Sequence, residues 1–156
     1  MATRSSSDSN TTDRELTVTR VIDAPRELVF QAWTDPAHVA RWWGPQGYTT
    51  QHCAMDIRPG GAYRFCMRSP EGTDYWKRGT YREIVAPERI VFTFAWEDAS
   101  GRPGHELLVS VTFEDLGTKT RLTLHQALFE TVENRDSHQI GWTSCLERFA
   151  EFMTTI

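Results

Sequence analysis

One long amphipathic helix near the C-terminal end constrains the fold of this chain more than any other stretch. It is predicted over Asp136 to Thr155, where apolar residues return at helical spacing and form a broad stripe on one side. Asp136 or Ser137 is expected to cap its first turn. A helix this apolar must lie against a large partner, and we expect a sheet that curls around it. The stripe consists of Trp142, Cys145, Leu146, Phe149, Phe152 and Met153, and continues backwards through His138.

Alternating runs in the preceding residues supply that sheet. Short turns between the runs favour antiparallel neighbours, and one-sided alternation indicates that one face of the sheet is covered. The inward face of the fourth run stays open, because Tyr75, Gly79 and Tyr81 compete with Trp76, Thr80 and Ile84. The predicted strands are Leu16–Ile22, Thr50–Ile57, Ala62–Arg68, Tyr75–Val85, Arg89–Trp96, 107–113 and 122–126.

Two short helices are predicted between the first strand and the second. Asp23 is expected to cap a helix that opens at Pro25, a favoured residue for a first turn. Asp35 and Pro36 end this helix and begin another, which runs through Trp42. The order is therefore one strand, two short helices, six strands and a long helix. Helices on one side of an antiparallel sheet make an α+β architecture.

The composition predicts one globular domain over residues 15–156, preceded by a disordered tail over residues 1–14. A net charge of −4 without a basic stripe argues against a nucleic-acid partner. No apolar run is long enough to insert into a membrane, and the N-terminal residues lack the apolar core of a signal peptide. Cys53, Cys66 and Cys145 are odd in number and scattered, which is typical of reduced thiols. We therefore expect a cytoplasmic protein.

The sequence predicts neither a metal site nor a cofactor. Its histidines are His38, His52, His105, His125 and His138, and none is paired at the spacing of a zinc site. The glycines around residues 44–47 and 60–61 mark turns, and the chain contains no phosphate-loop or dinucleotide fingerprint.

Several short motifs resemble the SRPBCC (START-like) superfamily, and within it the proteins similar to the C-terminal domain of the activator of heat-shock protein 90 ATPase. In order and spacing the match runs from about Leu16 to Met153. The motifs are Ile22-Asp23-Ala24-Pro25, Arg41-Trp42-Trp43-Gly44-Pro45, Asp56-Ile57-Arg58-Pro59-Gly60-Gly61, Glu88-Arg89-Ile90-Val91-Phe92-Thr93, Gly117-Thr118, and His138 with Gly141-Trp142.

The resemblance implies a helix-grip fold, in which a curved seven-stranded antiparallel sheet wraps around the C-terminal helix. It also implies a cavity between sheet and helix for a small hydrophobic or amphipathic ligand. Strand alternation and the helix stripe agree with that implication, since apolar walls with a few polar groups are what a ligand site needs. The expected lining residues are Trp43, Met55, Tyr63, Phe65, Met67, Tyr81, Phe92, Phe94, Trp96, Gln126, His138, Trp142, Cys145, Leu146 and Phe149.

A plainer interpretation of the same residues is a filled core. Aromatic side chains dominate the packing of cores, and a core with a gap is a pocket, so the two interpretations are compatible. His138 is interpreted as a hydrogen-bonded structural histidine in preference to a catalyst, because no second residue is fixed beside it. Cys145 on the buried stripe is interpreted as an inert thiol.

Three functions compete. The one we favour is a carrier or sensor that binds a small hydrophobic molecule, without catalytic residues. The first alternative is a co-chaperone-like partner of heat-shock protein 90; the eukaryotic activators have an additional N-terminal domain, for which we expect no room in 156 residues. The second is a cyclase-like or hydrolase-like enzyme, for which His138, Gln126, Tyr63 and Tyr81 are the acid–base candidates. A symmetric homodimer is the expected assembly if the chain assembles.

Overall fold

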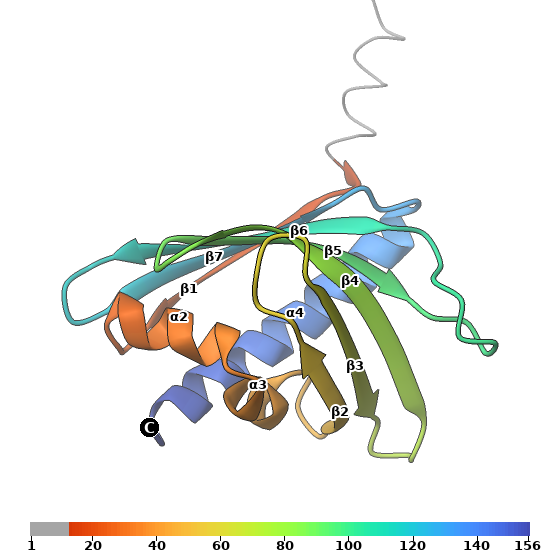
Figure 1. Ribbon diagram of the computed structural model, residues 1–156, viewed down its shortest axis with the longest axis horizontal. Coiled ribbons are helices and arrows are strands. Elements are labelled where there is room, and N and C mark those ends of the chain that lie inside the picture. The colour runs from red at the N-terminus through yellow and green to blue at the C-terminus, as the bar shows by residue number, and fades with distance from the viewer. Residues whose placement is uncertain (1–12) are drawn as a thin grey trace, which may run out of the picture.

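The computed structural model describes residues 13–156, so the expected tail lies outside the described residues except for Asp13 and Arg14. One curved antiparallel sheet and three helices make up the described part (Figure 1). The strands are β1 (Leu16–Ile22), β2 (Thr49–Met55), β3 (Ala62–Arg68), β4 (Asp74–Val85), β5 (Arg89–Trp96), β6 (Leu107–Asp115) and β7 (Thr120–Ala127). The helices are α2 (Arg26–Thr34), α3 (Pro36–Trp42) and α4 (Val132–Met153).

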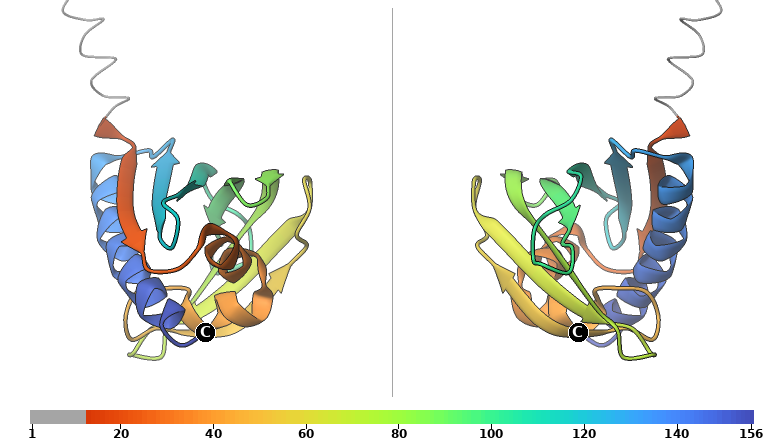
Figure 2. Two further views of the ribbon diagram at one scale, coloured as in Figure 1. Left: turned by 90° about the vertical axis from the view of Figure 1, so that its left-hand side faces the viewer. Right: turned by 90° about the vertical axis from the view of Figure 1, so that its right-hand side faces the viewer.

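The sheet has seven strands in the order β1-β7-β6-β5-β4-β3-β2, and every neighbouring pair is antiparallel. The first strand therefore pairs with the last, and Leu16 lies opposite Gln126. The sheet curves so that α4 lies along one side of its hollow face while β2, β3 and β4 lie on the other (Figure 2). Helices α2 and α3 lie at one end between them (Figure 2). The predicted α+β helix-grip architecture is confirmed.

Helix α4 begins earlier than the sequence pattern predicted. Its cap is Thr131, whose hydroxyl accepts a hydrogen bond from the backbone N–H of Asn134 at 3.1 Å, so the prediction of Asp136 or Ser137 as the cap is wrong. The apolar stripe begins only at His138, nearly two turns after the helix begins at Val132, which is why periodicity alone placed the start too late. The stripe itself is buried as predicted: Trp142, Cys145, Leu146, Phe149, Phe152 and Met153 are all covered.

The two short helices lie close to their predicted positions in the chain, and they differ from the prediction in one cap. Pro25 precedes α2 and no side chain caps it, so the predicted capping role of Asp23 is wrong. The Asp35 carboxylate accepts from the N–H of Ala37 at 3.0 Å and caps α3. The indole N–H of Trp42 donates to the carbonyl of Ala32 at 3.0 Å, which ties α3 to α2 inside the core.

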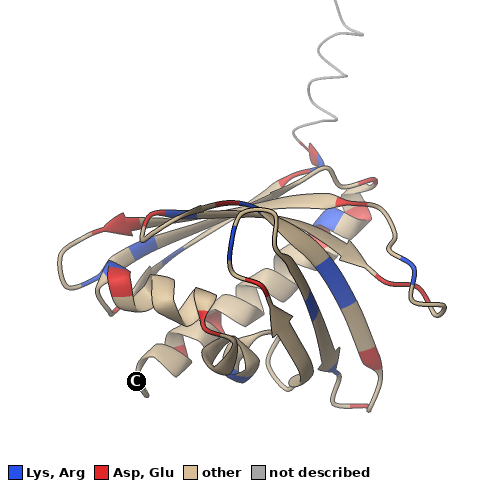
Figure 3. Ribbon diagram, viewed as in Figure 1, with Lys and Arg blue, Asp and Glu red and all other residues tan. Residues whose placement is uncertain are grey.

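Charged residues are interspersed over the sheet and the helices (Figure 3). None of the helices in residues 13–156 is long and apolar enough to cross a membrane.

Candidate functional site

A cavity of about 790 Å³ separates strands β3, β4 and β5 from the N-terminal half of α4; we call it the main cavity. The segment 43–48, His105 and Leu107, and residues Phe129 and Glu130 complete its wall. Sites for small molecules usually occupy about 300–1,000 Å³ and are mostly apolar. The main cavity has that size, and aromatic side chains form much of its wall. Seven of the predicted lining residues face it: Trp43, Met67, Phe94, Trp96, His138, Trp142 and Cys145.

Five further predicted residues lie deeper in the sheet, in a part that is filled. They surround a void of only about 10 Å³, no more than the minimum that a single water molecule needs. The ring of Tyr63 packs against Gly79 on the neighbouring strand, where a Cβ would lie 2.7 Å from Tyr63 Cε2. We call this region the packed half. Its predicted members are Met55, Tyr63, Phe65, Tyr81 and Phe92.

The remaining predicted residues, Gln126, Leu146 and Phe149, line neither space. Leu146 and Phe149 are fully buried in the core, where the Phe149 ring packs against Trp42 at 4.7 Å between centroids. Gln126 is also buried, directly behind the wall of the main cavity. The structure thus divides the predicted set into a cavity wall, a packed half and supporting core.

Gln126 organises the polar part of the wall. Its Oε1 accepts hydrogen bonds from Trp142 Nε1 at 2.7 Å and from His138 Nδ1 at 3.0 Å. The other nitrogen of His138, Nε2, lies 3.1 Å from Trp96 Nε1. An indole N–H only donates, so His138 Nε2 must accept and its proton must be on Nδ1. This arrangement requires a neutral ring, and burial, with Lys77 adding to it, lowers the pKa of His138 to about 4.

Lys77 is a cavity residue that periodicity did not find. It lies on β4 with its side chain inward and only 3 % of its surface exposed. A bulge between Tyr81 and Glu83 shifts the alternation of β4, so that Tyr75, Lys77, Gly79 and Tyr81 point inward, and Ile84 after the bulge does too. This shift explains why no single parity fitted the run. One other signal was present in the sequence: Lys77 and Lys119 are the only lysines among 17 basic residues.

Three aromatic rings surround the ammonium group of Lys77. Its Nζ lies 4.4 Å from the ring centroid of Trp43, 5.2 Å from that of Trp96 and 5.3 Å from that of Phe94. The only hydrogen-bonding atom recorded beside it within residues 13–156 is the Met67 sulfur at 3.8 Å. Burial lowers the pKa of Lys77 to about 7. We call Lys77 with these three rings the lysine cage.

The mouth of the main cavity is partly apolar. Ile140 of α4 lines it with 74 % of its surface exposed, and Tyr75 of β4 lines it with 42 % exposed. Gly141, the next residue of α4, leaves the wall open, since a Cβ there would meet nothing nearer than Pro45 at 4.0 Å. Glycine in a helix is about 1 kcal/mol less favourable than alanine, so the open space at Gly141 is accompanied by a less stable helix.

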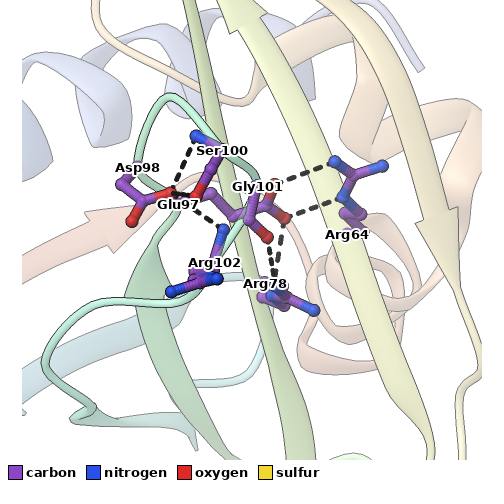
Figure 4. Close-up of polar contacts among 7 residues, drawn as sticks. All are labelled: Arg64, Arg78, Glu97, Asp98, Ser100, Gly101 and Arg102. Carbon is purple, nitrogen blue, oxygen red and sulfur yellow. Dashed lines mark hydrogen bonds and ion pairs between the residues drawn. The ribbon is translucent and has the colours of Figure 1, made fainter.

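The loop between β5 and β6 carries His105 into the wall and is held by an ionic network on the outer face of the sheet (Figure 4). Arg64 donates to both oxygens of Glu97, at 2.7 and 2.8 Å, and Arg78 lies 3.6 Å from the same carboxylate. The hydrogen bonds from Arg64 hold the pKa of Glu97 below its ordinary value. Asp98 closes the loop by accepting from Ser100 and Arg102 (Figure 4).

Within the part of the chain that the structure describes, no three His, Cys, Asp or Glu side chains converge as a metal site would require.

Comparison with known proteins places the chain in a family. The model of the family described as activator of Hsp90 ATPase homolog 1-like protein (AHSA1) matches residues 23–154. The chain belongs to this family. The AHSA1 match covers the whole sheet after β1, all three helices and every residue that lines the main cavity. The predicted resemblance, to the SRPBCC superfamily through this family, is confirmed.

Solved structures share the AHSA1 fold. The AHSA1 protein from Silicibacter pomeroyi is 28% identical, covers 90% of this chain and 98% of its own, and superposes with a TM-score of 0.82. A protein from Chromobacterium violaceum is 27% identical over 88% of this chain and 95% of its own, with a TM-score of 0.78. A protein from Arthrobacter aurescens, 23% identical over 94% of this chain and 89% of its own, has the same fold with a TM-score of 0.83. No curated protein sequence matches the chain.

Proposed function

We propose that this AHSA1-family domain binds a small amphipathic molecule in the main cavity, as a carrier or sensor. The observation that carries the proposal is the open space of about 790 Å³ between β3–β5 and α4, beside a packed half whose void is only about 10 Å³. Protein interiors normally leave few voids larger than a water molecule. An opening this large, with an apolar mouth, is what a ligand site needs.

Binding accounts for the polar groups of the wall better than acid–base catalysis does. Both ring nitrogens of His138 and the Oε1 of Gln126 are engaged in hydrogen bonds. The hydroxyl of Tyr63 donates to the carbonyl of Thr93, and burial raises the pKa of both Tyr63 and Tyr81. His138, Tyr63 and Tyr81 are therefore neutral near pH 7, and hydrogen bonds hold the side chains of His138, Tyr63 and Gln126 in place.

Filling the cavity tests the proposal. N-phenyl-1-naphthylamine is an uncharged probe that fluoresces in apolar surroundings, and we expect it to bind the wild-type protein. Gly141→Phe places a ring where the wall is open and should abolish that binding. Gly141→Ala is the matched control: it should keep probe binding and raise the free energy of unfolding by about 1 kcal/mol, since alanine favours the helix.

Fluorescence titration of the wild type, Gly141→Phe and Gly141→Ala with the probe tests whether it binds in the main cavity. Equal probe binding by wild type and Gly141→Phe would place the probe outside the main cavity and contradict the proposal, provided that circular dichroism shows the variant folded. No binding by the wild type would contradict it as well.

A co-chaperone-like role is the second candidate, favoured by the match of residues 23–154 to the family named after the activator of the Hsp90 ATPase. Its test is the ATPase rate of purified Hsp90 during titration with this protein. A rise in that rate would support the role, and a flat response would remove it. The Gly141→Phe variant separates the two functions. Because the substitution lies in the cavity wall, it should abolish probe binding without removing a chaperone contact outside the cavity.

A further inference from the structure

Lys77 is a basic group without an acidic partner. None of the ion pairs among residues 13–156 includes Lys77. Its Nζ is surrounded by the rings of Trp43, Phe94 and Trp96. A buried ammonium without a counter-charge destabilises a folded protein, and an apolar side chain of the same length would be more favourable there. Ring faces attract a cation, which offsets part of that cost but supplies no hydrogen-bond acceptor.

The groups that face Lys77 from neighbouring elements carry no compensating charge. His138 of α4 is held neutral by its hydrogen bonds to Gln126 and Trp96. Burial raises the pKa of Cys145 of α4 and of Cys53 of β2 to about 11, so both thiols keep their protons. Among the described residues of the wall, the one acid is Glu130, which is exposed.

An acidic group that pairs with Lys77 has to approach from the cavity, because the described side chains around Nζ carry no negative charge. Lys77 lines the main cavity, which is the space from which such a group would come. The cage offers a single charged donor, which suits a head group with one negative charge. The apolar body attached to that head would lie along Phe129 and Trp142 toward the mouth at Ile140.

We propose that the main cavity binds amphipathic monoanions, carboxylates or sulfonates, with the head group paired to Lys77 Nζ and the apolar body extending to the mouth. This inference rests on the proposed function, because it names the class of ligand for the same cavity. It assigns to Lys77 the role of the specificity-determining residue: the cage admits an uncharged ligand, but it prefers an anion.

A matched pair of probes tests this preference. 1-Anilinonaphthalene-8-sulfonate differs from N-phenyl-1-naphthylamine by its sulfonate alone, so the ratio of their affinities isolates the charge. We expect the wild type to bind the sulfonate about tenfold or more tightly than the neutral probe, as a charge-assisted hydrogen bond implies. Lys77→Met keeps an unbranched side chain as far as Cε and removes the charged Nζ, so it should lose that preference while still binding the neutral probe. Lys119→Met, at an exposed turn, is the control and should behave as the wild type.

The dependence on pH gives a second measurement on the unaltered protein. Above about pH 7 Lys77 loses its proton in the free protein. The sulfonate probe should therefore bind more weakly as the pH rises from about 6 to about 9, whereas the neutral probe should not.

Each outcome has one meaning. Equal affinity for the two probes in the wild type, or an unchanged ratio in Lys77→Met, would overturn the role of Lys77 and leave the ligand-binding cavity in place. Failure of the neutral probe to bind the wild type would overturn the proposed function, and this inference with it. Sulfonate binding that persists in Gly141→Phe would locate the anion outside the cavity and contradict the inference too.

Discussion

Lys77 is buried and His138 is half-buried in the wall of the main cavity, and their surroundings differ. Each nitrogen of His138 has a hydrogen-bond partner that fits the neutral ring. The Nζ of Lys77 has ring faces and a sulfur atom around it. Burial lowers both pKa values, to about 4 for His138 and about 7 for Lys77. The histidine is therefore neutral near pH 7, while the lysine is close to its point of half-protonation.

The low pKa of Lys77 predicts a stability that rises with pH. The unfolded chain holds the lysine proton up to about pH 10.5, whereas the folded protein has released it above about pH 7. Between those values the unfolded state binds more protons, so the free energy of unfolding should increase by up to about 1.4 kcal/mol per pH unit. Lys77→Met should be more stable than the wild type at pH 7 and should lack this increase.

Urea denaturation at several pH values between about 7 and 8.5 measures the difference between the two proteins. In the unfolded chain His138 titrates near the lower end of this window and Cys53 and Cys145 near its upper end, but both proteins contain these groups, so the difference between the two proteins isolates Lys77. A parallel dependence in wild type and Lys77→Met would contradict the prediction. Because the chain has two lysines, NMR of ¹³C-labelled lysine can also read the pKa of Lys77 directly against that of Lys119.

Two connecting segments that form the cavity wall are anchored by polar contacts to rigid elements. Arg148 of α4 donates to the carbonyls of Trp43 and Arg41, each at 3.1 Å, and Ser144 accepts from the N–H of Gln46 at 2.9 Å. These bonds hold the segment 43–48 against α4. On the other side of the cavity, Glu97 holds the loop after β5 against β3 and β4 (Figure 4). The shape of the opening therefore depends on both anchors.

Glu97→Gln should loosen the loop after β5. The substitution removes the charge that pairs with Arg64 and Arg78, and the Glu97 side chain is only 1% exposed, so water replaces little of the lost attraction. We expect faster hydrogen exchange over residues 97–106 and a lower melting temperature. Glu114→Gln is the matched control, since its pair with Arg121 at 2.8 Å involves a carboxylate that is 59% exposed.

Exposed pairs contribute only about 0–1 kcal/mol, so the control should change exchange and melting very little. Equal effects of the two substitutions would show that Glu97 is no more important than a surface charge, which would contradict its role as an anchor.

The interior as a unit is divided between close packing and open space. Around Phe149 the rings of Trp33 and Trp42 lie at 5.9 and 4.7 Å, and the packed half of the sheet continues this layer. One side of the Phe94 ring, by contrast, faces the main cavity. Both phenylalanines are buried, at 0% and 2% exposure, so burial alone does not separate them.

Phe→Ala substitutions at these two sites should differ in cost. Phe149→Ala leaves a void in a close-packed region and should lower the free energy of unfolding by about 3–5 kcal/mol. Phe94→Ala removes a ring that lacks packing partners on its cavity side, so its cost should be smaller, on the order of 1–2 kcal/mol. Urea denaturation of both variants measures the difference. Equal costs would indicate that the cavity is closed in solution.

Periodicity predicted most of the architecture because strand and helix patterns are local. The bounds of β1, β3 and β5 agree with the prediction to the residue, and the apolar stripe of α4 is buried as expected. The start of α4 and the cap of α2 were missed, because caps depend on the geometry of one or two residues and not on a repeat. The inward face of β4 could not be assigned, since a single bulge reverses the alternation on which the assignment depends.

The order of elements, the α+β class and the family motifs were therefore already present in the chain of residues, since each depends on neighbours along the sequence. Which aromatic residues face open space was not, and neither was the burial of Lys77. Both depend on the distance between β3–β5 and α4, elements that lie far apart in sequence and meet only when the sheet curves. Alternation shows that a side chain points inward, but only the folded chain determines whether another side chain fills the space in front of it.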